Sequence, residues 1–532
     1  MQMKESRRIP TPAILGTTLL LMAACASLAK PSASSSTPAL ATPTAAVAAS
    51  ATSPAGTTET HLTVVDPTIL EKTFVVSPDG RHVAWVASQG VKSLVVVDAK
   101  SEGPYDAVGT EKGEGLPSFS PDGLHVAYVA KQSGNYLVVL DGKPQGPFDL
   151  VGFSEGGGVP IFSSDSQHLA FVSQTGNKYH VVLDGESQGS YDAIGLTSPV
   201  FSPDGQHLAY VAVLGGQTFQ VLDGKSQPAH DAVDGLRFSP DSQHWAYSVK
   251  KGSQWLVIRD GLPGKAYADV QLTLSPFSPD SQHLAYRAVA GARQVMVLDG
   301  KEGFPLEGID ANDIAFSADS SRLAYAASTG QRWEVVVEGQ PGDTYQNVGM
   351  PIFSADSQHV AYAATRGTAW LVVEDGKEGK AYFGLGEDSL RFTPDGSHLT
   401  YTANDGTNWF GVIDNEELGP YDNVSAVFYS PDGAQSAFLV VSGKRQFMMQ
   451  NGRKQTAYDI VGAPVFSPDS RHLAYMAGVG DTRFVILDGK EGTPYDFIIG
   501  TEQGGIYFDG TASLHYLALR GDEVLLVTQN IP

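Results

Sequence analysis

The chain has 532 residues, a formal net charge of -23 and only 17% charged residues. A surface that binds nucleic-acid phosphates needs clustered positive charge, so this composition argues against a nucleic-acid-binding protein. Apolar residues make up 42% of the chain and glycines number 58, which favours a packed fold of many strands joined by tight turns.

The N-terminus has the pattern of an export signal. Basic residues in the first eight positions precede an apolar stretch at 13–24, which is too short to span a bilayer as a helix. The stretch runs into Cys25, the only cysteine, through Leu21-Met22-Ala23-Ala24. This resembles the lipobox of bacterial lipoproteins, with Met22 where Leu is more usual. The resemblance implies that residues 1–24 are removed and Cys25 is lipidated; the alternative is an ordinary signal peptide with an incidental cysteine.

Residues 25–60 form a segment of Ala, Ser, Thr and Pro with almost no charge. Such a segment cannot bury enough apolar surface to fold. We interpret it as a disordered tether between the membrane and a folded part, so that membrane contact is made through Cys25 alone. The exported protein would then face the periplasm or the cell exterior.

One sequence pattern recurs twelve times between about residue 61 and the C-terminus. Its clearest copy is Phe277-Ser278-Pro279-Asp280-Ser281-Gln282-His283-Leu284-Ala285-Tyr286. The turn aspartate recurs at 79, 122, 165, 204, 241, 280, 319, 356, 395, 432 and 469, with Gly510 in its place in a degraded last copy. The mean period of about 39 residues is close to that of a four-stranded propeller blade.

Each copy carries three further markers at fixed spacing. An aromatic residue follows the turn aspartate by six positions, and a second turn, usually Asp-Gly, follows that aromatic by thirteen. Asp-Gly tolerates the positive φ angles of a two-residue hairpin. Seven residues later comes a third marker, usually Tyr, as at Tyr105 and Tyr345. The pattern predicts four antiparallel strands per copy.

The Phe-Ser-Pro-Asp-Gly…Leu-Ala-Tyr pattern resembles the blade repeat of TolB-type propellers, which are relatives of WD-repeat proteins. The resemblance implies an all-β propeller of twelve four-stranded blades. Because propellers typically have 4–8 blades, we expect two six-bladed rings in tandem, 61–310 and 311–532. The orphan strand Leu62 to Val65 would complete the sixth blade. A division into seven and five blades, or one ring, stays open.

Repeated side chains are the obvious candidates for chemistry. Nine histidines share one register: His82, His125, His168, His207, His244, His283, His359, His398 and His472. A metal needs three or four ligands converging at about 2 Å, whereas one histidine per blade spreads them around a ring. We interpret these histidines and the turn aspartates as local hydrogen-bonding groups, and we expect no metal and no cofactor. Trp255, Trp333, Trp370 and Trp409 also share a register, which favours blade packing over a sugar-stacking surface.

All variation in repeat length falls between the third marker and the next turn aspartate, where the spacing runs from 11 to 17 residues. We expect these connectors to emerge on one face, an arrangement typical of recognition loops on a rigid scaffold. The two longest are neighbours and supply the candidate partner-binding residues Glu111, Lys112, Glu114, Ser154 and Glu155. The alternative is that they are merely tolerated surface loops.

The leading hypothesis is therefore a non-catalytic, lipid-anchored propeller that binds a protein or polysaccharide partner. Neither a P-loop nor a His-Glu-x-x-His motif is present. Two alternatives stay open: a propeller enzyme such as a polysaccharide lyase or glycosidase, and a structural component of the envelope. The fold alone does not choose among these functions.

Overall fold

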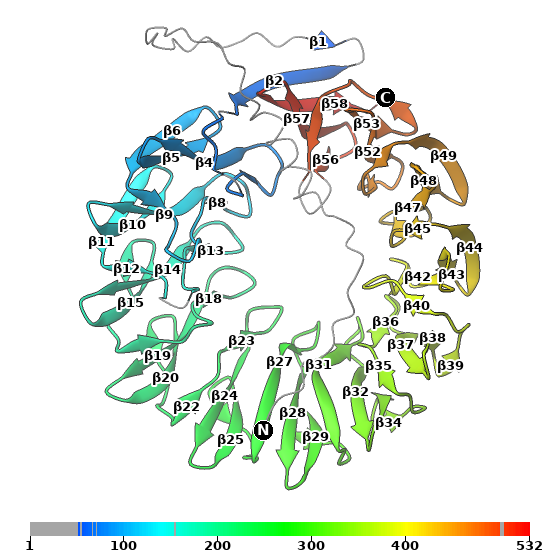
Figure 1. Cartoon of the computed structure of the whole chain (residues 1–532). Coiled ribbons are helices and arrows are strands. Elements are labelled where there is room, and N and C mark those ends of the chain that lie inside the picture. The colour runs from blue at the N-terminus through cyan, green and yellow to red at the C-terminus, as the bar shows by residue number, and fades with distance from the viewer. Residues whose placement is uncertain are drawn as a thin grey trace.

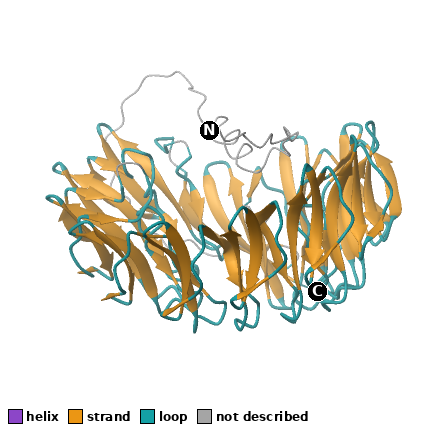
Figure 2. Ribbon diagram, turned by 90° about the horizontal axis from the view of Figure 1, so that it is seen from below, coloured by secondary structure: helices purple, strands orange, loops and turns teal. Residues whose placement is uncertain are grey.

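The computed structural model describes residues 52–53, 56–65, 67–70, 72–153, 156–500 and 505–531. Within these ranges every regular element is a strand, and no helix is long and apolar enough to cross a membrane. The strands form twelve sheets arranged as blades around a central opening (Figure 1), and the side view shows one tier of blades (Figure 2). This confirms the predicted all-β propeller of twelve blades. The described residues do not include the predicted signal peptide, Cys25 or most of the tether. They also do not include Ser154 and Glu155.

Blade 6 shows the basic unit. Its strands are β27 (Asp269–Phe277) at the inner edge, then β28 (Leu284–Ala290), β29 (Arg293–Leu298) and β30 (Lys301–Glu302) at the outer edge, each antiparallel to its neighbour. The hairpin between β29 and β30 has φ angles of 49° at Asp299 and 76° at Gly300. Two successive positive φ values are those of the type I′ turn, which confirms the prediction from Asp-Gly.

The two middle strands of each blade carry most of its buried side chains. The second strands are β4 (Val83–Gln89), β9 (Val126–Gln132), β14 (Leu169–Thr175), β19 (Leu208–Leu214), β24 (Trp245–Lys251), β28, β32 (Leu323–Thr329), β37 (Val360–Arg366), β42 (Leu399–Asn404), β47 (Ser436–Ser442), β52 (Leu473–Val479) and β57 (Ser513–Arg520). The third strands are β5 (Lys92–Val97), β10 (Asn135–Leu140), β15 (Lys178–Leu183), β20 (Gln217–Leu222), β25 (Gln254–Arg259), β29, β33 (Arg332–Val337), β38 (Ala369–Glu374), β43 (Trp409–Ile413), β48 (Arg445–Gln450), β53 (Thr482–Leu487) and β58 (Glu523–Asn530).

The core lies between neighbouring blades rather than inside one sheet. The third-marker tyrosine of one blade meets the second-strand aromatic of the next: the rings of Tyr382 and Tyr401 pack edge to face with their centroids 6.2 Å apart. The same contact joins Tyr105 to Tyr128, whose hydroxyls are 3.0 Å apart. Edge-to-face aromatic pairs stabilise a fold by more than the burial of their apolar surface alone. The fixed spacing of the two aromatic markers is therefore a blade-to-blade packing requirement.

The ring is closed by its first long strand. β2 (Thr57–Val64) pairs antiparallel with β58 and supplies the outer strand of the twelfth blade. The expected division into two six-bladed rings is therefore wrong, because the orphan strand completes blade 12 and not blade 6. At the expected boundary, β27 of blade 6 contacts β31 (Gly308–Phe316) of blade 7, so the two halves form one continuous ring (Figure 1).

Candidate binding surfaces of the ring

In nine blades the register histidine joins the Ser-Pro-Asp turn to the second turn, which lies at the same end of the blade. In blade 6, Nδ1 of His283 lies 2.6 Å from Oδ2 of Asp299, and Oδ1 of the same aspartate accepts the N–H of Leu284 at 3.0 Å. Oγ of Ser278 donates to Asp280 at 2.5 Å and accepts the N–H of His283 at 3.0 Å. All nine register histidines make this contact with the aspartate of the second turn. The interpretation as local hydrogen-bonding groups is confirmed.

Two blades that lack the histidine replace both partners together. In blade 7, Nε of Arg322 lies 3.2 Å from Oε2 of Glu338, and in blade 10 Asn451 replaces the aspartate and accepts the N–H of Ser436 at 2.8 Å. Blade 7 thus keeps a side-chain pair with other residues, and blade 10 keeps the bond from the second turn to the backbone. Among the described residues, no group of three or more His, Cys, Asp and Glu could hold a metal ion.

Six of the turn aspartates link their blade to the next. The N–H of Asp280 donates to Oγ of Ser320 in the following blade at 2.9 Å, and the same bond joins Asp241 to Ser281 at 3.0 Å. The hydroxyl of Ser278 holds the pKa of Asp280 below its usual range, because a hydrogen bond to the carboxylate favours the charged form. These six aspartates therefore join neighbouring blades at the end where the turns lie, and Asp280 is negatively charged at neutral pH.

The variable connectors are insertions in the inner strand. In blade 2 the inner strand has two pieces, β7 (Ala107–Val108) and β8 (Ser118–Phe119), both paired with β9. Between them, the N–H of Gly109 and the carbonyl of Gly115 both bond to Val129, so the loop leaves the strand at mid-height. The connector of blade 2 thus interrupts the inner strand after β7, and the expectation that all connectors emerge on one face stays a prediction.

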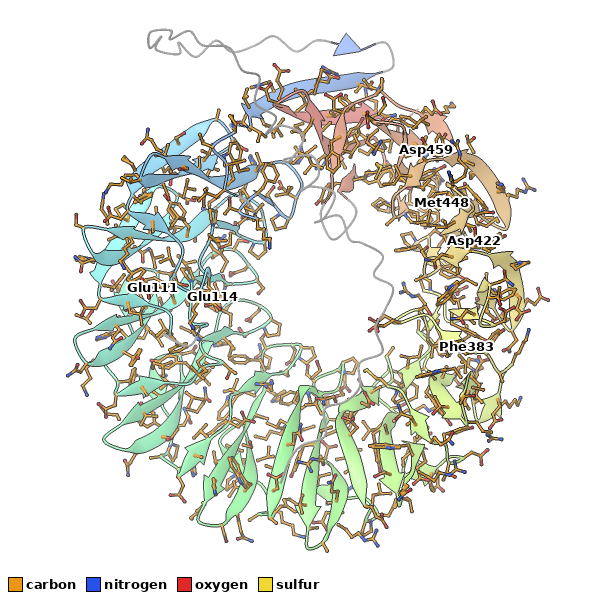
Figure 3. All side chains as sticks on the ribbon, in the orientation of Figure 1. Glu111, Glu114, Phe383, Asp422, Met448 and Asp459 are labelled. Carbon is orange, nitrogen blue, oxygen red and sulfur yellow. The ribbon has the colours of Figure 1, made fainter. Side chains whose placement is uncertain are left out.

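The predicted contact residues of blade 2, Glu111, Lys112 and Glu114, differ in their surroundings. Figure 3 shows Glu114 nearer the central opening than Glu111. Oε2 of Glu114 accepts the N–H of Gly157 at 2.7 Å, so this carboxylate ties the insertion of blade 2 to that of blade 3. Glu111 is 84% exposed at its side chain and lies 3.7 Å from Nζ of Lys131. Lys112 is exposed. Of the described candidates, Glu111 and Lys112 are therefore accessible, and Glu114 positions the loops.

The sequence holds one match to the Gly-x-Ser-x-Gly pattern of hydrolase nucleophiles, at 185–189. The pattern needs a sharp strand-to-helix turn to expose its serine. Here Ser187 lies on the short outer strand β16 (Glu186–Ser187) of blade 3, directly after a type I′ turn. Nδ1 of His180 lies 3.1 Å from Oγ of Ser187 but is closer, at 2.9 Å, to the carbonyl oxygen of Gly189. This backbone is not a nucleophile elbow.

The four register tryptophans are half-buried, and three of them pack between blades. Trp333 contacts the buried cluster between blades 7 and 8, and Trp255 contacts the one between blades 5 and 6. Each is paired across the sheet with a third-marker tyrosine, as Trp370 is with Tyr382. The packing interpretation of these residues is confirmed for Trp255, Trp333 and Trp409, which contact such clusters.

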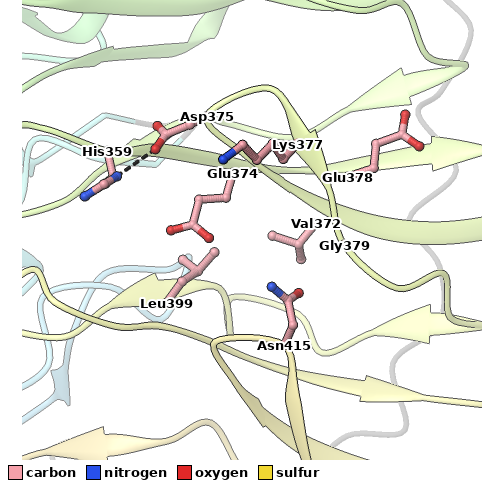
Figure 4. Close-up of a pocket in the computed structure, with 9 residues that line it drawn as sticks. All are labelled: His359, Val372, Glu374, Asp375, Lys377, Glu378, Gly379, Leu399 and Asn415. Carbon is pink, nitrogen blue, oxygen red and sulfur yellow. Dashed lines mark hydrogen bonds and ion pairs between the residues drawn. The ribbon is translucent and has the colours of Figure 1, made fainter.

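Grooves between neighbouring blades form hollows on the described surface. The groove between blades 8 and 9 has a volume of about 300 Å³, and Figure 4 shows Glu374 within it beside Leu399 and Asn415. The equivalent groove between blades 3 and 4 has about 230 Å³, with Leu183 in the place of Glu374. Burial, with the neighbouring Asp375 and Asp414, raises the pKa of Glu374. Sequence analysis missed this residue. The signal was visible, because eight of eleven blades have Val, Leu or Ile directly before the second turn and this blade has Glu.

Comparison with known proteins shows no match to a protein family, and no curated protein matches the chain. Solved structures with which it aligns include a eukaryotic initiation factor (14% identity, TM-score 0.32, covering 64% of this chain and 95% of that one). The tricorn protease aligns at 12% identity and a TM-score of 0.24, over 79% of this chain and 58% of that one. The Dos1 propeller aligns at 11% identity and a TM-score of 0.25, over 62% and 90%. The assignment of the fold rests on the strand pairing itself.

Proposed function

We propose that this chain is a non-catalytic binding scaffold, anchored outside the cytoplasm through a lipid on Cys25, that holds a protein or polymer partner at the insertions of blades 2 and 3. The observation that carries the proposal is the confinement of length variation to the inner strand. Every other spacing in the repeat is fixed by a contact, such as the His–Asp pair or the Tyr–Tyr packing. Only the inner strands vary in length, and these strands would contact a ligand in the central opening.

The two longest insertions form one surface. Glu114 bonds to Gly157, and a Cβ placed on Gly157 would lie 3.4 Å from the carbonyl oxygen of Leu196 in the insertion of blade 4. Leu196 is 57% exposed. Three neighbouring insertions thus contact one another in series, with charged groups at Glu111 and Lys112 of blade 2 and an exposed apolar residue at Leu196 of blade 4. A mixture of apolar and charged groups on a braced backbone is suited to a protein surface.

Site-specific photocrosslinking tests the proposal. We place a photoreactive residue at Lys112 in the native host and, as a matched control, at Leu262, which is 73% exposed on the outer strand of blade 5. The proposal expects an adduct of one defined mass from position 112 and none from position 262. Equal adducts from both positions, or none from position 112, would contradict it. A polysaccharide in the adduct would identify the polymer form of the partner, and turnover of that polymer would favour an enzyme.

A further inference from the structure

The groove between blades 8 and 9 holds a carboxylate that the fold does not need. Glu374 is the last residue of β38, where eight other blades have Val, Leu or Ile, such as Leu183, Leu298 and Leu487. Its carboxylate makes no hydrogen bond or ion pair within the described part of the chain. A half-buried charge without a partner destabilises a fold, so packing alone would favour leucine here.

The other acidic groups of the groove, Asp375 and Glu378, are already paired. Asp375 is bound by His359 at 2.6 Å and by the N–H of Val360 at 3.0 Å, and Glu378 is bound by Arg366 and by the hydroxyl of Tyr345 at 3.0 Å. Lys377 lies directly across the hairpin from Glu374. A lysine stands at the same place opposite Leu140, Leu222 and Leu298, so Lys377 belongs to the repeat and is not there to neutralise Glu374.

The groove is also open where its counterpart is filled. In the groove between blades 3 and 4, Gln188 occupies the position that Gly379 has here. A Cβ on Gly379 would lie 2.8 Å from Oδ1 of Asn415. Val372 and Leu399 complete an apolar wall beside the two oxygen-bearing side chains. A volume of about 300 Å³ is at the small end of ligand pockets and suits one side chain rather than a cofactor.

We propose that this groove binds an arginine side chain presented by a partner, with the guanidinium paired to Glu374 and Asn415 Oδ1 and the methylenes against Val372 and Leu399. A planar fork of N–H donors matches a carboxylate better than a single ammonium does. The site is lined by the second turns and outer strands of its blades, away from the insertions. It stands whether or not the insertions bind a partner.

The test uses the purified protein with Nα-acetyl-L-arginine methylamide as probe and its uncharged citrulline counterpart as control, measured by calorimetry. We expect the arginine probe to bind and the citrulline probe not to bind. Glu374→Leu, which copies blade 3, and Gly379→Gln, which copies Gln188, should each weaken binding by about tenfold or more. Lys377→Gln should strengthen it, because a like charge is removed. The reciprocal variant Leu183→Glu, which places the carboxylate in the other groove, should leave the affinity of this groove unchanged.

Glu374→Leu should also melt at the same or a higher temperature than the parent, because an unpaired carboxylate is replaced by an apolar side chain; this separates loss of binding from loss of folding. No binding of the arginine probe to the parent, or equal affinity in Glu374→Leu, would overturn the proposal. Tighter binding of the lysine analogue of the probe would show that the groove prefers an ammonium and would overturn the assignment to arginine. The crosslinking test at Lys112 does not involve these residues, so the two proposals fail separately.

Discussion

Glu59 and Arg520 form the ion pair that fastens the first long strand of the ring to its last blade. Both carboxylate oxygens of Glu59 accept N–H groups of Arg520 at 2.7 Å, and Oε1 also accepts the hydroxyl of Tyr495 at 2.7 Å. Glu59 lies opposite Val527, just as Glu378 lies opposite Val373 and Glu491 opposite Ile486 in blades 8 and 11. β2 therefore reproduces an ordinary outer strand, including its tyrosine-binding glutamate.

Replacing Glu59 with Gln should loosen the closure. The change removes the charge and part of a two-pronged bond to Arg520, and because Arg520 is 47% exposed we expect a loss of only about 1 kcal/mol. Chemical denaturation of parent and variant measures it. Arg520→Gln in the Glu59→Gln background should cost little more, since the partner is already gone. Additive losses would show that the two residues do not act as a pair.

The closure should also depend on pH. The hydrogen bond from Arg520 holds the pKa of Glu59 below its ordinary value of 4.5. A lowered folded-state pKa contributes stability that is complete above pH 4.5 and is lost as the pH falls through the folded value. The difference in stability between the parent and Glu59→Gln should therefore be constant above pH 4.5 and shrink below it. A difference that grows on acidification would contradict this assignment.

Deleting β2, residues 57–64, should destabilise the whole ring. The deletion exposes the outer edge of β58 and leaves Tyr495 and Arg520 without their acceptor. We expect a lower melting temperature and self-association through the open edge, measured by calorimetry and light scattering. The Glu59→Gln variant is the milder control. An unchanged melting temperature would mean that the ring does not need its closing strand.

The turn network of blade 6 gives a graded prediction. His283→Ala removes one side of an exposed pair and should cost about 0.2–1 kcal/mol. Asp299→Ala should cost more, because it also frees the N–H of Leu284 and places alanine at a φ of 49°. Asp299→Asn should be close to neutral, since Asn451 serves at the same position of blade 10. Denaturation of the three variants gives the order, and the reverse order would contradict the proposed roles.

Lipidation of Cys25 stays a prediction from the lipobox resemblance. If it occurs, the parent protein should partition into the detergent phase of a two-phase extraction, and Cys25→Ala should stay in the aqueous phase. Globomycin-type inhibition of lipoprotein processing should leave the longer precursor in the parent alone. Equal partitioning of both proteins would contradict the anchor.

The blade could be predicted because its turns have local sequence patterns. The closure of the ring could not, because it depends on pairing between distant strands. Ser-Pro-Asp, Asp-Gly and the aromatic spacings each report contacts within one blade or between neighbours, so blade number and strand order could be predicted. The pairing of Glu59 with Val527 joins the two ends of the ring and leaves no local pattern. The sequence analysis did not predict that the insertions lie within the inner strand. An apolar pair after the third marker, such as Ala107-Val108, signals the start of that strand.

The central claim is that the insertions of blades 2 and 3 carry recognition, and shortening them tests it most directly. Both connectors are cut to the eleven-residue spacing of blades 4 to 5, whose inner strand runs through β22 (Ala232–Val233) and β23 (Arg237–Phe238). Folding is checked by the melting temperature, and the affinity for the partner crosslinked at Lys112 is measured by surface plasmon resonance. The account predicts a folded ring that has lost binding by about a hundredfold or more. A folded ring that keeps the parental affinity would contradict it.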